Sequence, residues 1–168
     1  MSKDTAKRII SHAVITLVVY LLQAAFFSGL KIGGAAPMIL PLAAVGFGLF
    51  DGGLWGGIWG LICGILCDVS LTDSGCLFTV FLTIAGFFTG FLSEFVLARG
   101  FPSFLTVSLA VLVLSAAFQL VGPCFYREVP FSVVWKPALW QTLYSAAFIL
   151  PVYYPIHRAT RSTRRVRI

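Results

Sequence analysis

Few side chains in this sequence could do chemistry, and the carboxylates Asp51 and Asp68 stand out among them. They bracket a glycine-rich apolar stretch, residues 50–68. A carboxylate at the end of a membrane helix is usually solvated at the interface, whereas one that faces the interior of a helix bundle is a functional candidate. The sequence leaves both interpretations open.

The two histidines offer these acids no obvious partner. His12 lies at the basic end of the first apolar segment, where we expect it at the membrane interface, and His157 lies near the other end of the chain. Acid–base or metal chemistry requires groups that converge, and these positions do not predict convergence. We therefore expect no enzymatic activity, no metal site and no cofactor.

Three glutamines, Gln23, Gln119 and Gln141, each fall in the outer half of an expected membrane helix. A glutamine buried in lipid must find a hydrogen-bond partner. One interpretation is that they join helices, at about 0.6 kcal/mol per contact. The other is a shared polar site that opens to the outside and holds a small solute.

Glycines recur every fourth residue in two segments. Glycine weakens a helix by about 1 kcal/mol relative to alanine, so a regular row of glycines indicates that close backbone approach compensates for this loss. Each row predicts either helix packing within the protein or a groove for a single-span partner helix or a second copy of the chain. The residues are Gly56, Gly60 and Gly64 in one segment and Gly86 and Gly90 in the next.

The elements that carry these residues are membrane helices. Hydrophobic residues make up 59% of the chain, charged residues only 11%, and the mean hydropathy is +0.97, whereas soluble domains carry about 25% charged residues. We predict an all-α polytopic membrane protein with one transmembrane domain, residues 1–157, and a basic tail, residues 158–168. The six expected spans are residues 9–30, 37–50, 54–69, 76–97, 103–121 and 135–154.

The second and third of these segments are shorter than an ideal span of about 20 residues. Either they cross the membrane with little tilt, or they form a hairpin that dips into it. The sequence leaves this open.

Basic residues predict the orientation. With six spans and both termini in the cytoplasm, nine of the twelve basic residues lie inside, as the positive-inside rule requires. Only Lys31, Arg127 and Lys136 then lie outside. Because the basic residues gather at the chain ends, nucleic-acid binding is not indicated, and we expect the tail to contact anionic lipid head groups. The arginines of the tail are Arg158, Arg161, Arg164, Arg165 and Arg167.

The order of these features resembles the bacterial rod-shape-determining MreD family over roughly residues 15–105; the remainder matches it only in length and hydropathy. The resemblance rests on Tyr20-Leu-Leu-Gln23, Pro37, Leu49-Phe50-Asp51-Gly52, Gly56-Gly57, Trp59-Gly60, Gly64-Ile-Leu-Cys-Asp68, Gly75, Gly86, Gly90 and Arg99.

This resemblance implies a non-enzymatic protein of the cytoplasmic membrane that belongs to the cell-elongation complex. Such a protein would bind the membrane-anchored scaffold MreC and, through it, the MreB filament and the peptidoglycan polymerase and transpeptidase. The resemblance also implies a six-helix fold similar to the substrate-binding components of energy-coupling-factor vitamin transporters.

Those transporter components are the main alternative. They require a polar pocket in the outer half of the bundle, which the three glutamines weakly offer. They often dock their transport partner through an Ala-xxx-Ala face in the first span, and this first span has none. We therefore expect a scaffold rather than a vitamin-binding component.

Overall fold

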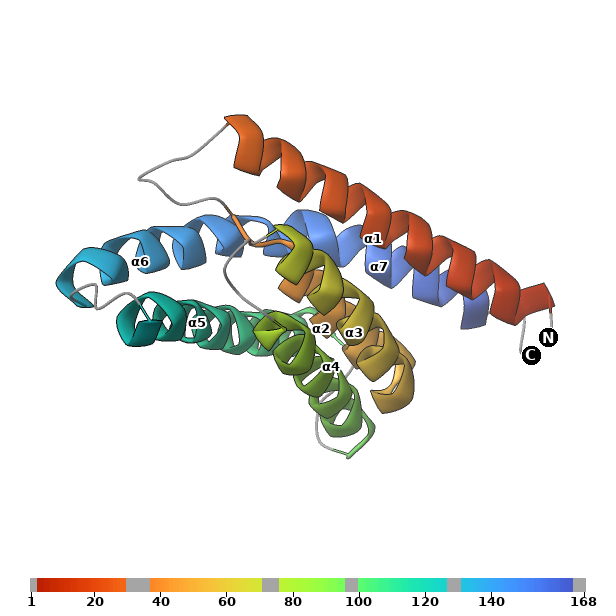
Figure 1. Cartoon of the computed structure of the whole chain (residues 1–168). Coiled ribbons are helices and arrows are strands. Elements are labelled where there is room, and N and C mark those ends of the chain that lie inside the picture. Colours follow the sequence, from red (N-terminus) through yellow and green to blue (C-terminus); the bar gives the residue numbers. More distant parts are fainter. Residues whose placement is uncertain (1–2, 30–36, 71–75, 96–99, 127–130, 165–168) are drawn as a thin grey trace.

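The computed structural model describes residues 3–29, 37–70, 76–95, 100–126 and 131–164, and within these ranges the protein is entirely helical (Figure 1). The seven helices are α1 (Lys3–Gly29), α2 (Leu40–Asp51), α3 (Gly53–Ser70), α4 (Leu77–Phe95), α5 (Phe101–Tyr126), α6 (Phe131–Ala147) and α7 (Ile149–Arg164).

A tight turn at Gly52 joins α2 and α3 into an antiparallel hairpin. Pro41 lies in the first turn of α2, where its missing N–H has no intrahelical acceptor in any case. Gly52 has φ 96°, a conformation that favours glycine, and its N–H donates to the carbonyl of Gly48. The Asp-Gly-Gly sequence thus reverses the chain within a single residue.

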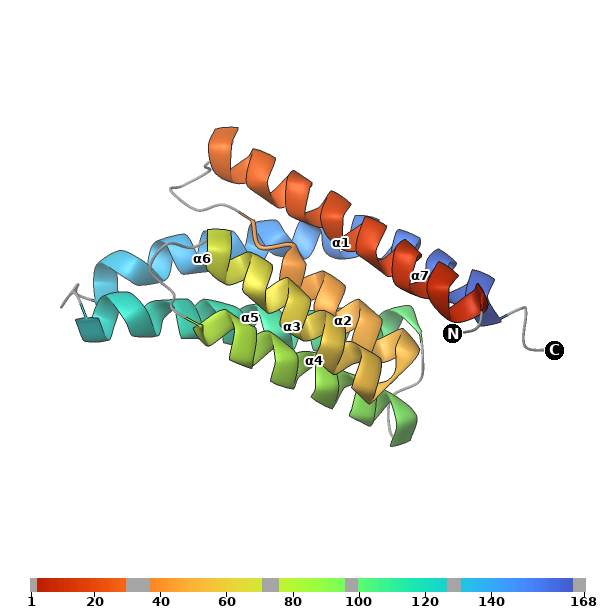
Figure 2. The same ribbon diagram turned by 45° about the vertical axis from the view of Figure 1, so that its right-hand side comes forward.

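Helix α2 lies at the centre of the bundle, and every residue from Leu40 to Phe50 is buried. It packs against α3 and α4 on one side and against α5, α7 and α1 on the others. Figures 1 and 2 both show α1 and α7 side by side, so the start of α1 and the end of α7 lie at the same end of the molecule. Helices α5 and α6 form a second pair.

Four of the described helices are long and apolar enough to cross a membrane, over Ala6–Ala25, Gly53–Ser70, Leu77–Phe95 and Phe101–Gln119. Their outward surfaces carry large exposed apolar side chains such as Leu17, Leu54 and Phe88. The chain is therefore a helical membrane protein. At 12 residues, α2 is about 18 Å long, shorter than the hydrocarbon core of about 30 Å.

The last expected span, residues 135–154, covers parts of two helices, α6 and α7. The helix is interrupted at Phe148, and α7 continues to Arg164, beyond the expected domain boundary at residue 157. Pro151 has no N–H to donate to the carbonyl of Ala147, which explains a break at this point. Helix α5 likewise continues past the expected end at residue 121 to Tyr126.

Candidate functional site

A buried histidine–aspartate pair joins α1 to the end of α2. His12 Nε2 lies 2.5 Å from Asp51 Oδ2. The two side chains are 2% and 4% exposed. Of the two interpretations of Asp51, the structure therefore gives the one in which the carboxylate faces the bundle interior.

The other ring nitrogen of His12 also faces an oxygen. Nδ1 lies 2.7 Å from the backbone carbonyl of Arg8, one turn earlier on α1. A carbonyl only accepts hydrogen bonds, so Nδ1 carries the hydrogen and donates it. Both nitrogens of the ring are thus directed at oxygen atoms that act as acceptors when Asp51 is ionised.

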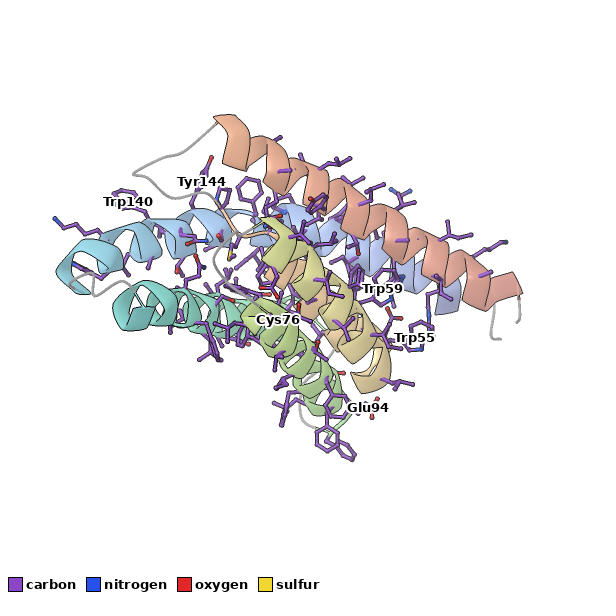
Figure 3. The ribbon with its side chains drawn as sticks, viewed as in Figure 1. Trp55, Trp59, Cys76, Glu94, Trp140 and Tyr144 are labelled. Carbon is purple, nitrogen blue, oxygen red and sulfur yellow. The ribbon has the colours of Figure 1, made fainter. Side chains whose placement is uncertain are left out.

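Aromatic side chains and one arginine enclose the pair. The His12 ring centroid lies 4.5 Å from that of Phe47 and 5.6 Å from that of Trp59. Arg8 Nη1 lies 3.8 Å from Asp51 Oδ1, and its guanidinium carbon lies 4.1 Å from the ring centroid of Trp55. Figure 3 shows Trp55 and Trp59 between α3 and the neighbouring α1 and α7. Aromatic faces attract cations, so this enclosure suits a protonated imidazole.

Our expectation that the histidines do not converge with the acids is wrong for His12, which contacts Asp51. A spacing of four residues recurs on each helix that builds the site, and it could have indicated the convergence because it places both members on one helix face. The pairs are Arg8 and His12 on α1, Phe47 and Asp51 on α2, and Trp55 and Trp59 on α3.

Asp68 has a different role, at the other end of the α2–α3 hairpin. Its carboxylate accepts hydrogen bonds from the backbone N–H of Phe78 at 3.2 Å, and from the N–H and the hydroxyl of Thr79 at 2.8 and 2.6 Å. The first N–H groups of a helix lack intrahelical acceptors, and a carboxylate there is favourable. Asp68 therefore caps α4 from the end of α3.

Side chains from two other helices cap the start of α2 in the same way. Gln23 Oε1 accepts hydrogen bonds from the N–H groups of Ile39 and Leu40 at 2.9 and 3.0 Å. Ser145 Oγ on α6 accepts one from the N–H of Met38 at 2.9 Å. Of the two interpretations of Gln23, the structure thus favours a contact that joins helices.

Gln119 and Gln141 line a cavity beside this point, together with Ser115, Thr142 and Ser145, and Gln119 Nε2 donates to the sulfur of Met38 at 3.1 Å. The cavity is about 10 Å³, enough for about one water molecule. Gln23 does not line it. The three glutamines thus gather around the start of α2 without sharing a solute-sized pocket in the described part of the chain.

The glycine rows of α3 and α4 face each other. A Cβ atom on Gly56 would overlap the carbonyl oxygen of Gly86, and one on Gly90 would overlap the backbone of Gly53. A Cβ atom on Gly60 would overlap the carbonyl of Leu82, and a Cβ atom on Gly64 would overlap the backbone of Thr79.

The expectation that Gly86 and Gly90 form a groove for a partner helix is therefore wrong, because α3 of the same chain fills it. The interpretation as packing within the protein is the one that the structure shows.

The arginine tail is only partly described. Arg158 is exposed on α7, and Arg161 and Arg164 belong to the same helix. The side chains of these last two, and Arg165 and Arg167 as a whole, lie outside the described residues.

Comparison with protein-family models, with characterised proteins and with solved structures found no match to this chain. The six-span topology, the similarity to vitamin transporter components and the family resemblance therefore stay predictions.

Proposed function

We propose that this protein is a non-enzymatic component of the bacterial cell-elongation complex in the cytoplasmic membrane. It would scaffold peptidoglycan synthesis by binding an MreC-like protein and, through it, the MreB filament and the polymerase and transpeptidase. The observation that carries the proposal is the order of glycines and aspartates between Asp51 and Gly90. The described members of this series belong to one packed unit, α2–α4, in which they form the turn, the glycine contact and the helix cap.

The topology that goes with this proposal has six crossings and both termini in the cytoplasm, with α6 and α7 together making the sixth. The meeting of the start of α1 and the end of α7 at one end of the bundle supports it (Figure 1). The same arrangement brings the start of α1, which carries Lys7 and Arg8, and the arginine-bearing end of α7 to one end of the bundle, which suits the cytoplasmic leaflet with its anionic lipids.

The filled α3–α4 groove changes where a partner would bind. An MreC-like anchor helix, or a second copy of this chain, has to bind an outward-facing surface instead. The outer face of α4 is one such surface, since Phe87, Phe88 and Phe91 are all exposed.

Co-purification and cell shape test the proposal together. The full chain, tagged in its own bacterium, should co-purify with the MreC-like protein of that genome, and its depletion should turn rods into spheres. Re-expression of the untagged chain should restore the rods and serves as the control. Unchanged shape after depletion, together with no co-purified MreC-like protein, would reject the proposal.

The transporter alternative depends on the glutamine cavity, whose volume suits a water molecule rather than a vitamin. A ligand at about 100 times its Kd stabilises a protein by about 2.7 kcal/mol. We expect no vitamin to raise the melting temperature of the purified protein. A clear rise with one vitamin would favour the transporter component.

A further inference from the structure

We propose that His12 and Asp51 form a proton-binding site, and that the bound proton holds α1 on the α2–α3 hairpin. The ligand of this site is the proton itself. The inference rests on the geometry of the two side chains and does not depend on the proposed function.

The two contacts of the imidazole ring determine how many hydrogens it must carry. Nδ1 needs its hydrogen to donate to the carbonyl of Arg8. If Asp51 were ionised and His12 neutral, the lone pair of Nε2 would then face a carboxylate oxygen at 2.5 Å, and no hydrogen would lie between them. Two acceptors at that distance repel each other, so the contact requires one further proton, shared by the ring and the carboxylate.

The surroundings favour retention of this proton. Phe47 and Trp59 pack against the ring and exclude water, and an unpaired carboxylate would be costly in such a place. Arg8 reaches only the other oxygen of Asp51, at 3.8 Å, and so does not replace the proton at Oδ2.

The remaining titratable groups near the site come from other helices. On α7, His157 stacks on Tyr153 and meets the edge of Phe50, the neighbour of Asp51, and Arg158 follows it. On α4, Glu94 lies close to Gly52 (Figure 3). None of these hydrogen-bonds to the His12–Asp51 pair among the described residues.

Release of the proton would act on α1 in particular. The described polar contacts of α1 with α2 and its cap are the His12–Asp51 pair, the Arg8–Asp51 ion pair beside it and the cap at Gln23. Most of the other large side chains of α1 between His12 and Gln23 face outward. Only the first of these contacts contains an exchangeable shared proton. Once the proton is lost, the longer Arg8–Asp51 ion pair, at 3.8 Å, is the polar contact that remains at this end, so this end of α1 should loosen while the Gln23 end stays.

Nuclear magnetic resonance of ¹⁵N-histidine in the full-length protein in lipid nanodiscs tests the site directly. The chain has only two histidines, and His157→Gln assigns the remaining signal to His12. We expect His12 to carry hydrogen on Nδ1, directed at the carbonyl of Arg8, and a shared hydrogen at Nε2, directed at Asp51. In Asp51→Asn the shared hydrogen should be lost. Asp68→Asn, which changes an acid distant in the chain, should leave the His12 signal as it is.

Because the His12 signal of the wild-type protein is itself decisive, the test does not depend on the folding of the Asp51→Asn variant. A neutral His12 with a bare Nε2 in the wild-type protein would overturn the proton-binding site.

Distance measurement between spin labels tests the effect on α1. Labels at the exposed positions Ile10 and Leu54, in a variant without native cysteines, report the separation of α1 from the hairpin. We expect the distance to lengthen or broaden as the pH rises, and to be long at every pH in Asp51→Asn. A distance that is constant with pH and unchanged by Asp51→Asn would overturn the role of the proton in holding α1.

Discussion

Helix α1 and the α3–α4 pair are held in the bundle by different contacts. Helices α3 and α4 approach so closely that a Cβ on Gly56 would overlap the backbone of Gly86. Helix α1 has no comparable glycine row, and many of its large side chains, such as Leu17 and Leu21, are exposed. Val19 packs into the core, and the polar contacts of α1 with α2 and its cap lie at Arg8 and His12 near one end and at Gln23 near the other.

The difference illustrates how helices associate in lipid. Lipid chains are as apolar as leucine, so the burial of one apolar side chain against another gives little preference for protein over lipid. Helices can associate through close backbone packing or through hydrogen bonds between side chains. This protein uses the first for α3–α4 and the second for α1, so changes at the two contacts should have different signatures.

The largest effect is expected at the buried pair. His12→Leu or Asp51→Leu alone leaves the other member buried and without its partner, at a cost of about 3–5 kcal/mol of unfolding free energy. The unfolding free energy lost in the double variant should be smaller than the sum of the losses in the two single variants. Reversible unfolding in detergent would measure all three. Additive losses would show that the two residues do not act as a pair.

Substitution at the glycine contact between α3 and α4 should lower the unfolding free energy by a smaller amount. Gly56→Ala places a methyl group against the backbone of Gly86 and Gly48, which cannot move aside, and overpacking of this kind costs about 1–3 kcal/mol. Gly57→Ala is the matched control, because its Cβ would make an ordinary contact of 3.5 Å with the side chain of Phe87.

The unfolding free energy of Gly57→Ala should equal that of the wild type or exceed it by up to about 1 kcal/mol, because alanine has the higher helix propensity. Equal melting temperatures for the two alanine variants would contradict the close approach of α3 and α4.

The cap at the start of α2 should matter less. Gln23→Leu removes the acceptor of two backbone N–H groups, and the loss of a helix cap costs about 0.5–2 kcal/mol. Gln119→Leu is the comparison, since its described partner is the sulfur of Met38, a weak acceptor. A greater loss of thermal stability in the Gln119 variant would reverse our assignment of the two glutamines.

Substitutions on the outward face of α1 should have almost no effect on stability. Leu17 is 58% exposed, and Leu17→Ala should change stability by less than about 0.5 kcal/mol. If this variant lowers the melting temperature as much as Gln23→Leu does, α1 is held by its apolar surface and the contrast with α3–α4 disappears.

Local features of the fold could be predicted from the sequence. The turn at Gly52 and the glycine rows of α3 and α4 depend on residues near each other in the chain, and both lie where the pattern indicates. The ends of helices were harder to predict from the sequence. The break at Phe148 is an example, because an apolar segment that contains Pro151 can also be interpreted as one continuous span.

The candidate site could not be predicted from hydropathy. His12 and Asp51 are 39 residues apart, and each lies at the polar end of an apolar segment, where solvation is the usual outcome. Likewise, the glycine row of α4 indicates a close neighbour without showing that the neighbour is α3. In both cases the missing information is which helices meet in three dimensions.

The complete burial of α2 has a consequence for how the protein tolerates variation. A helix with one lipid-facing side accepts substitutions with a period of about 3.6 residues. From Leu40 to Phe50 no residue faces outward, so saturation mutagenesis should find uniform sensitivity along α2. The same experiment should find a clear helical period along α4, where buried Phe81, Leu82 and Gly86 alternate with exposed Val80, Ile84 and Phe88. Helix α3 likewise alternates buried Trp59 and Cys63 with exposed Ile58 and Leu61, so the hairpin turn at Gly52 would mark the point where uniform sensitivity gives way to a periodic pattern.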